Sequence, residues 1–388
     1  AARVSGKHRP PPGASTAVDT RPPSGTAPSG PVPPDASPAG SSPPVSRDPA
    51  DRSPLLDLPG AVPAEGRDAG VAWHYGDPVA EARRLEAGAG VVDLSHRGVV
   101  RVGGPDRLSW LHALTTQDLA ELPPLTSTEA LVLDPHGHVE HALHVVDDGE
   151  ATWLTVEPGT AAALVAWLRG MRFLRDVEID DVTADWAVVA DTRPREAGPA
   201  GPLTWADPWP RRGPESPSYA AVADGDHPGE IRSWWEVLLP RERFVELVDP
   251  ATLAGTWAAE ALRVAAWRPR LGSETDHRTI PHELDWLRTA VHLRKGCYRG
   301  QETIARVHNL GRPPRRLVML HLDGSDHALP AHGAEVTLDE RPVGRVTTPV
   351  RHHELGPIAL AVLRRKTPVD AVLLADGVPA AQEVVVAP

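Results

Sequence analysis

The feature that most constrains this chain is that its 388 residues contain a single cysteine, Cys297. One cysteine cannot form an internal disulfide, and by itself it cannot supply a four-cysteine zinc site or hold an iron–sulfur cluster. Folding must therefore depend on an apolar core, for which a hydrophobic content of 41% is ample. The length allows two domains, or one large domain with appendages.

The charge balance and the apolar pattern exclude several classes of protein. A formal net charge of −12 argues against nonspecific nucleic-acid binding, which depends on neutralising phosphates with Lys and Arg. No apolar run approaches the ~20 residues that a membrane-spanning helix needs. The first residues, AARVSGKHRP, lack the apolar segment of a secretory signal. We therefore expect a cytoplasmic protein without direct nucleic-acid or membrane contacts.

The composition divides the chain into three parts. Residues 1–70 are rich in Pro, Gly and Ser, and no aromatic residue precedes Trp73, so we expect a disordered tail. Residues 71–313 carry strand and helix patterns, interrupted by a Pro-rich loop over 193–230. Residues 314–388 carry six short strand patterns separated by turns, which predict a small barrel or sandwich.

The pattern within residues 71–313 predicts an α+β fold. Pro78 is placed for the first turn of a helix that Gly88 and Gly90 would end. An amphipathic helix around Leu111 and a second over 160–169 are separated by an antiparallel meander with turns at 135–138 and 147–149. Single helices between antiparallel strands do not make a doubly wound sheet.

The chain lacks the usual nucleotide and metal motifs. No GxGxxG follows a predicted strand, and no GxxxxGK[ST] or HExxH occurs. Four histidines lie at strand spacing, but solvated strand and turn histidines are common and we do not expect a metal site there; they are His136, His138, His141 and His144.

Cys297 lies in the run KGCYRGQET, which is unlike a core strand. Glycines at 296 and 300 permit tight backbone turns, and Lys295 and Arg299 favour a thiolate. Tyr298, Gln301 and Glu302 provide flat and hydrogen-bonding surface for a planar heteroaromatic ligand. We therefore predict that the working site is built around Cys297. A nucleophilic Cys–His enzyme is the alternative, although no second motif accompanies the cysteine.

The run KGCYRGQET resembles the signature of the YgfZ family, folate-binding proteins related to the aminomethyltransferase (T-protein) of the glycine cleavage system. Further segments resemble the wider T-protein superfamily: GVVDLSHRGVVRVGGPDRLSWLHALTTQDL, EALRV, Pro281-His282-Glu283 and RPVGRVTTPV. The resemblance covers roughly residues 72–388.

The resemblance implies a T-protein-like ring of α+β units around a central folate channel, closed by a C-terminal β-barrel. It also implies tetrahydrofolate as the cofactor and a role in assembling or repairing iron–sulfur clusters, including those of radical-SAM enzymes that methylthiolate tRNA. Matched position by position, the motif comprises Lys295, Gly296, Cys297, Tyr298, Gly300, Gln301 and Glu302, with Cys297 as the functional thiol.

Folate chemistry suggests further binding residues. The pterin edge offers two adjacent N–H donors to a buried carboxylate, for which Glu236 and Glu260 are candidates. The anionic glutamate tail would pair with Arg263 or Lys295. Asp93 is a weaker candidate, because its position before a turn also suits capping.

One departure from the family bears on the reaction. Aminomethyltransferases carry an essential acidic residue in the strand after the GG hairpin turn, where this chain reads HVEHALHVV. The best register places His141 at that position, and a slip of one residue would place Glu140 there. This favours an accessory role in cluster assembly. The alternatives are a tetrahydrofolate-dependent aminomethyl or one-carbon transferase, and a scaffold that binds no folate.

Overall fold

The computed structural model describes residues 52–193, 201–325 and 328–388. The described part of the tail predicted over residues 1–70 is not structureless. It forms the 3-10 turns η2 (Pro54–Asp57) and η3 (Gly66–Asp68) and strand β1 (Val62–Pro63), which pairs with β2 (Ala72–His74). Leu55 is buried, which anchors this segment to the core. Residues 1–51 lie outside the described part.

The first sheet is entirely antiparallel and has the strand order β5-β6-β7-β4-β8. Its helices α2 (Arg107–Leu114) and α3 (Ala161–Gly170) share one core with these strands. In α3 the buried residues Ala161, Leu164, Val165 and Leu168 recur at helical spacing, which explains why this face packs on the sheet. The strands are β4 (Gly98–Gly103), β5 (Ser127–Leu133), β6 (Val139–Asp147), β7 (Ala151–Val156) and β8 (Glu178–Asp181).

The second sheet has the order β10-β11-β9-β3-β12, and only β3 and β12 pair in parallel. Helices α1 (Pro78–Glu86) and α5 (Thr256–Ala265) pack in its core, and the Asp77 carboxylate caps α1 by accepting from the Ala80 amide at 2.9 Å. The strands are β3 (Val91–Asp93), β9 (Trp186–Asp191), β10 (Thr204–Ala206), β11 (Trp235–Pro240) and β12 (Leu253–Ala254).

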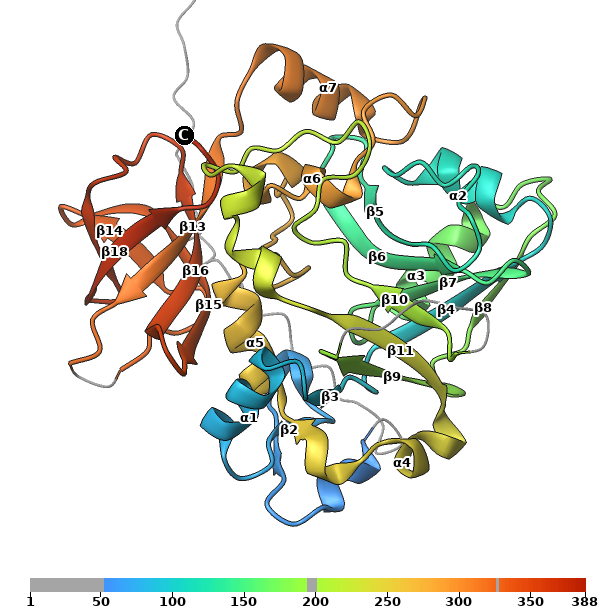
Figure 1. Cartoon of the computed structure of the whole chain (residues 1–388). Coiled ribbons are helices and arrows are strands. Elements are labelled where there is room, and N and C mark those ends of the chain that lie inside the picture. Colours follow the sequence, from blue (N-terminus) through green and yellow to red (C-terminus); the bar gives the residue numbers. More distant parts are fainter. Residues whose placement is uncertain (1–51, 194–200, 326–327) are drawn as a thin grey trace, which may run out of the picture. The chain divides into compact units, whose positions relative to one another are not determined.

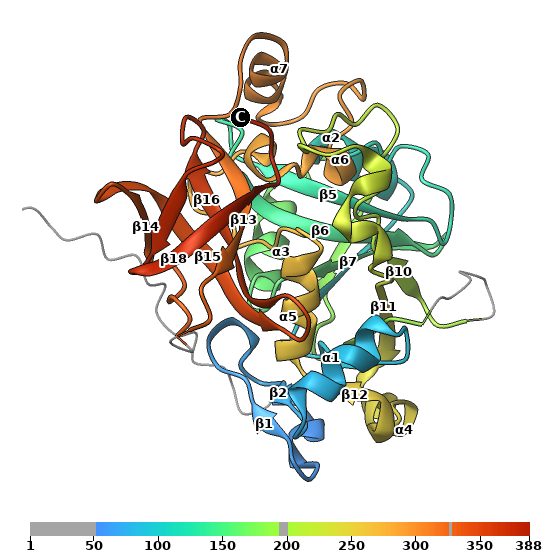
Figure 2. The same cartoon turned by 60° about the vertical axis from the view of Figure 1, so that its left-hand side comes forward.

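The C-terminal strands form a closed antiparallel barrel in the order β13-β16-β15-β14-β17-β18, with β18 pairing back onto β13. Figure 1 shows the barrel in orange and red beside α5, and Figure 2 shows the same neighbours after rotation. The strands are β13 (Arg315–Leu322), β14 (Glu335–Leu338), β15 (Arg341–His352), β16 (Gly356–Arg364), β17 (Val372–Ala375) and β18 (Val378–Val384).

Shorter elements connect these units: α4 (Phe244–Leu247), α6 (Leu287–Ala290), α7 (Gln301–Leu310), η4 (Asp224–Asp226), η5 (Pro228–Ile231), η6 (Arg241–Arg243), η7 (Pro250–Thr252) and η8 (Pro281–Leu284). Part of the loop predicted over 193–230 lies outside the described residues, and the remainder holds β10, η4 and most of η5. No helix in the described ranges has the length and hydropathy that crossing a bilayer requires. The predicted α+β class and the C-terminal barrel are confirmed.

Candidate functional site

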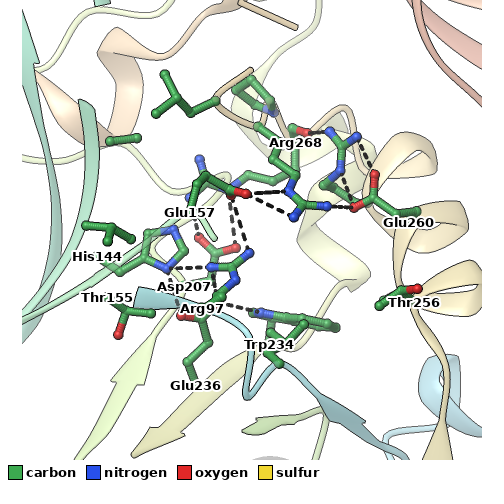
Figure 3. A pocket seen from close by; sticks show the side chains of 18 of the residues that line it. Arg97, His144, Thr155, Glu157, Asp207, Trp234, Glu236, Thr256, Glu260 and Arg268 are labelled. Carbon is green, nitrogen blue, oxygen red and sulfur yellow. Dashed lines mark hydrogen bonds and ion pairs between the residues drawn. The ribbon is translucent and has the colours of Figure 1, made fainter. Parts of the chain in front are cut away.

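A small internal pocket lies where the two sheets and α5 meet, and Figure 3 shows its side chains. Strand β6 contributes Ala142 and His144, and β11 contributes Glu236. The complete lining is Asp68, Leu94, Arg97, Ala142, His144, Thr155, Val156, Glu157, Asp207, Arg232, Trp234, Glu236, Thr256, Ala259, Glu260, Arg263, Arg268, Pro269, Arg270, Leu271 and Trp286.

Glu236 is fully buried at the centre of one ion-pair cluster. Arg97 Nη1 donates to its Oε1 at 2.9 Å, and His144 Nδ1 lies 2.8 Å from its Oε2. An ionised carboxylate only accepts, so His144 must carry its proton on Nδ1. Burial alone would raise the pKa of Glu236, but Arg97 and His144 hold that pKa at about 2. Glu236 is therefore ionised at neutral pH.

A second cluster surrounds Arg270. Its guanidinium donates to both oxygens of Glu157, to both oxygens of Asp68 and to Glu260 Oε1. Asp68 also lies 3.0 Å from His96 Nε2. Because of these contacts the η3 turn, which we expected in the tail, supplies a buried pocket residue.

Arg263 is saturated by protein acceptors. Nε and Nη2 donate to the two oxygens of Glu260, Nη1 donates to Glu274 Oε2 and the Arg268 carbonyl, and Nη2 also donates to Thr348 Oγ1. All five of its N–H groups are thus used within the chain. An anionic ligand could pair with Arg263 only by replacing one of these acceptors.

The pocket chemistry fits an acceptor-rich, partly aromatic ligand such as tetrahydrofolate. Arg97 Nε and Arg232 Nε are buried donors without a partner in the described part of the chain, and the indoles of Trp234 and Trp286 line the wall. The cavity volume is only about 50 Å³. A folate-sized ligand must therefore displace side chains to enter.

Cys297 lies outside this pocket, on the loop between α6 and α7, and its side chain is exposed. Lys295 is buried and its ammonium donates to the Thr115 carbonyl at 2.6 Å and to the His112 carbonyl, both at the C-terminal end of α2. Lys295 Nζ also lies 5.2 Å from the centre of the Tyr298 ring. Lys295 therefore attaches the cysteine loop to α2.

The start of α7 packs against the turn between β5 and β6. Gly300 has φ +81°, and a Cβ there would lie 2.6 Å from the Asp134 carbonyl oxygen, so only glycine fits. Arg299 pairs with Glu140 across the same contact at 2.9 Å. The spacing of the motif is thus explained partly by this packing.

His282, in the turn η8, is completely buried. Its ring lies edge-on to Tyr219, whose hydroxyl is 3.0 Å from His308 Nδ1 on α7. Burial, with a smaller contribution from His308, lowers the pKa of His282 to about 4. The imidazole is therefore neutral at pH 7.

The predicted site residues fall into two separate groups. Glu236, Glu260 and Arg263 line the internal pocket, whereas no residue of the 295–302 run does. Tyr298 is buried, Gln301 is half-buried and Glu302 is exposed, with the last two in the first turn of α7. The structure thus does not bring the thiol and the pocket carboxylates into one cavity.

The remaining candidates lie at strand ends. Asp93 is buried, its Oδ1 accepts from the Ser95 amide at 2.9 Å, and its Oδ2 has no partner among residues 52–193, 201–325 and 328–388. His141 and Glu140 do not line the pocket; the residues of β6 that do are Ala142 and His144. Strand β6, in which the resemblance predicts an acidic residue, therefore presents no carboxylate to the pocket.

The sequence analysis did not find seven of the charged residues that line the pocket. Four are arginines, Arg97, Arg232, Arg268 and Arg270, and three are acidic, Asp68, Glu157 and Asp207. Their partners lie far away in the sequence; Arg97 and Glu236, for example, are 139 residues apart. The one available signal for Arg97 is its place after DLSH, in a segment that resembles the T-protein superfamily.

Comparison with known proteins finds one matching domain model and a solved structure of similar fold. Residues 62–195 match the GCVT N-terminal domain model. Over 86% of this chain, the structure superposes on 95% of the glycine cleavage system aminomethyltransferase T from Bartonella henselae, with a TM-score of 0.67 and 18% sequence identity. Residues 62–195 therefore match a GCVT N-terminal domain, and the chain shares the fold of that aminomethyltransferase T structure.

Three relatives by sequence differ in what they are named for. A putative chloroplastic transferase of Arabidopsis thaliana is 28% identical over 68% of this chain and 62% of its own length. An aminomethyltransferase of Nostoc sp. is 27% identical over 74% of this chain and 80% of its own length. A mitochondrial iron–sulfur cluster assembly factor IBA57 homolog of Mycosarcoma maydis is 26% identical over 62% of this chain and 63% of its own length.

Proposed function

We propose that this chain is a folate-binding accessory protein of iron–sulfur cluster assembly or repair, of the YgfZ type, that acts through Cys297. The observation that carries the proposal is that the thiol is exposed at the surface while the candidate folate pocket is internal. An exposed thiol suits contact with a client protein, whereas a catalytic thiol acting on folate would have to face the pocket.

Two further observations support the accessory role. Strand β6 presents Ala142 and His144 to the pocket and no carboxylate, so the acid expected of an aminomethyltransferase is missing there. The similarity to an iron–sulfur cluster assembly factor extends over 62% of the chain. The clients would be iron–sulfur enzymes such as radical-SAM tRNA-modifying enzymes, and the cytoplasm is the compartment in which a lone thiol stays reduced.

In this proposal the pocket residues hold tetrahydrofolate. Glu236 would accept from the pterin edge, and Glu260 would provide a second buried carboxylate. Glu236 already accepts from Arg97, His144 and, at 3.4 Å, Trp234 Nε1. A carboxylate has about four acceptor positions. A ligand with two adjacent N–H donors would therefore replace at least one of these protein donors.

The thiol would act at the protein surface. Cys297 would ligate or protect a cluster held jointly with the client, while Lys295, Tyr298, Gln301 and Glu302 would shape the loop around it. One cysteine cannot hold a cluster alone, so the client must supply the remaining ligands.

The second candidate is a tetrahydrofolate-dependent aminomethyl or one-carbon transferase. The similarity to aminomethyltransferases over 74% of the chain favours it, as do the ionised carboxylates that line the pocket. This candidate predicts turnover with tetrahydrofolate and a methylamine-bearing donor, unaffected by changing Cys297.

The test combines calorimetric titration of the full chain with tetrahydrofolate and a client-enzyme assay in cells under oxidative stress. The variants are Cys297→Ser, Glu236→Gln and Asn309→Ala, an exposed control on α7. The proposal expects Cys297→Ser to bind folate normally but to lose client activity, Glu236→Gln to bind folate at least tenfold more weakly, and Asn309→Ala to behave as wild type.

Each half of the proposal can fail separately. Full client activity in Cys297→Ser would refute the role of the thiol. Absence of folate binding in the wild-type chain would refute the cofactor and leave a scaffold with an exposed thiol. Turnover of an aminomethyl donor would establish the second candidate.

A further inference from the structure

Three side chains of types that can bind a metal ion lie close together at the junction of α1 and the barrel. Glu86 is the last residue of α1, and His353 and Glu354 directly follow β15. One donor atom from each lies within 4.8 Å of the other two. Residues 267 positions apart in the sequence therefore converge on one point.

The histidine of this cluster is held in place. The His353 side chain is only 1% exposed and its Nε2 lies 2.8 Å from Glu86 Oε2. Its Nδ1 is buried and has no hydrogen-bond partner among the residues that the structure describes. Its ring also lies against that of His352, with the centroids 4.5 Å apart. The two glutamates, in contrast, are exposed.

We propose that Glu86, His353 and Glu354 bind a divalent transition-metal ion such as Zn²⁺. One imidazole and two carboxylates are ligands that Zn²⁺ accepts at about 2.0–2.2 Å. Two such donors on a tetrahedral ion are roughly 3.4 Å apart. To complete the set, Glu86 Oε2 must move out from its 2.8 Å contact with His353 Nε2, and the exposed Glu354 carboxylate must move closer. The imidazole disfavours Mg²⁺, which prefers oxygen ligands and retains its waters.

The site opens onto a second cavity. This cavity has a volume of about 190 Å³, and Glu86 and Glu354 form part of its wall with the apolar side chains of Leu85, Leu262 and Leu355. Three protein ligands leave one position of a tetrahedral ion open. That position would face a small ligand with an apolar body and a metal-binding head group.

The decisive experiment is calorimetric titration of Zn²⁺ into the tag-free, EDTA-treated full chain, with Mg²⁺ titrated in parallel. We expect one Zn²⁺ per chain and no heat of binding from Mg²⁺. Glu86→Gln keeps the size of the side chain and should weaken Zn²⁺ binding at least tenfold, as should His353→Gln. A melting temperature that rises with Zn²⁺ in wild type but not in these variants gives a second readout.

Two controls make the result specific. His321→Gln changes another His–Glu pair of the barrel, with Glu383 at 2.9 Å, which has no third donor within reach among the described residues. Cys297→Ser removes the only thiol that could bind zinc. Both variants should bind Zn²⁺ as wild type does.

Failure is equally clear. No Zn²⁺ binding in wild type, or equal binding in wild type and Glu86→Gln, would show that the Glu86–His353 contact is a structural ion pair only. Loss of binding in Cys297→Ser would place the metal at the thiol instead. None of these three results depends on whether the chain binds folate.

Discussion

The Glu236–Arg97 pair allows a prediction whose size follows from the structure. Glu236→Gln removes the charge of a fully buried carboxylate and leaves the Arg97 guanidinium with Glu157, at 3.7 Å, as its remaining carboxylate neighbour among the described residues. Leaving a buried charge without its partner is costly, typically about 3–5 kcal/mol.

The pKa of Glu236 gives a second route to the magnitude. That pKa is about 2 in the folded chain against an ordinary 4.5. At about 1.4 kcal/mol per pH unit, this difference corresponds to about 3 kcal/mol of folding stability. Because the folded pKa is the lower one, this contribution is present above about pH 4.5 and is lost as the pH falls towards 2. Glu236→Gln should remove that part of the acid dependence.

The assay is urea denaturation followed by circular dichroism at pH 7 and at several values down to pH 3. Glu140→Gln is the matched control, because its partner Arg299 lies at the same 2.9 Å but both side chains are more than 30% exposed. We expect a loss of about 3 kcal/mol for Glu236→Gln and less than about 1 kcal/mol for Glu140→Gln. Equal losses in the two variants would refute the reasoning from burial.

Three further predictions concern the loop that carries the thiol and the buried histidine of η8. Gly300→Ala, at φ +81° and with its Cβ 2.6 Å from a carbonyl oxygen, should destabilise the chain by more than about 2 kcal/mol. Thermal melting should show a smaller loss, about 1–2 kcal/mol, for Gly296→Ala, where φ is +93° but the space is open, so that only the backbone strain remains. Lys295→Met should cost about 1–3 kcal/mol by leaving two carbonyls at the end of α2 without their donor, and an unchanged melting temperature would contradict this. The pKa of His282 is about 4, against an ordinary 6.5, so the unfolded state takes up the proton first as the pH falls. The free energy of unfolding should therefore decrease by about 3 kcal/mol as the pH falls from 6.5 to 4. An acid titration of His282→Leu should lack that loss.

Local patterns predicted much of the fold. Pro78 and Gly88 marked the ends of α1, the apolar spacing around Leu164 marked α3, and alternation with turn residues marked β5, β6 and β7. These signals are short-range, since each depends on backbone preferences and on one face of one element. The segment 52–70 was misjudged because its burial depends on contacts with distant parts of the core.

The sequence by itself determined that the chain has one thiol, that its neighbours need glycine backbone freedom at 296 and 300, and that the fold is α+β with a terminal barrel. Only the tertiary structure decided that Glu236 is ionised beside Arg97, that Arg263 is saturated by Glu260 and Glu274, and that Cys297 lies apart from both. The physical reason is that the pKa and the pairing of a buried charge are set by burial and by partners as many as 202 residues away, as in Arg270 and Asp68. Such partners leave no periodic trace in the sequence.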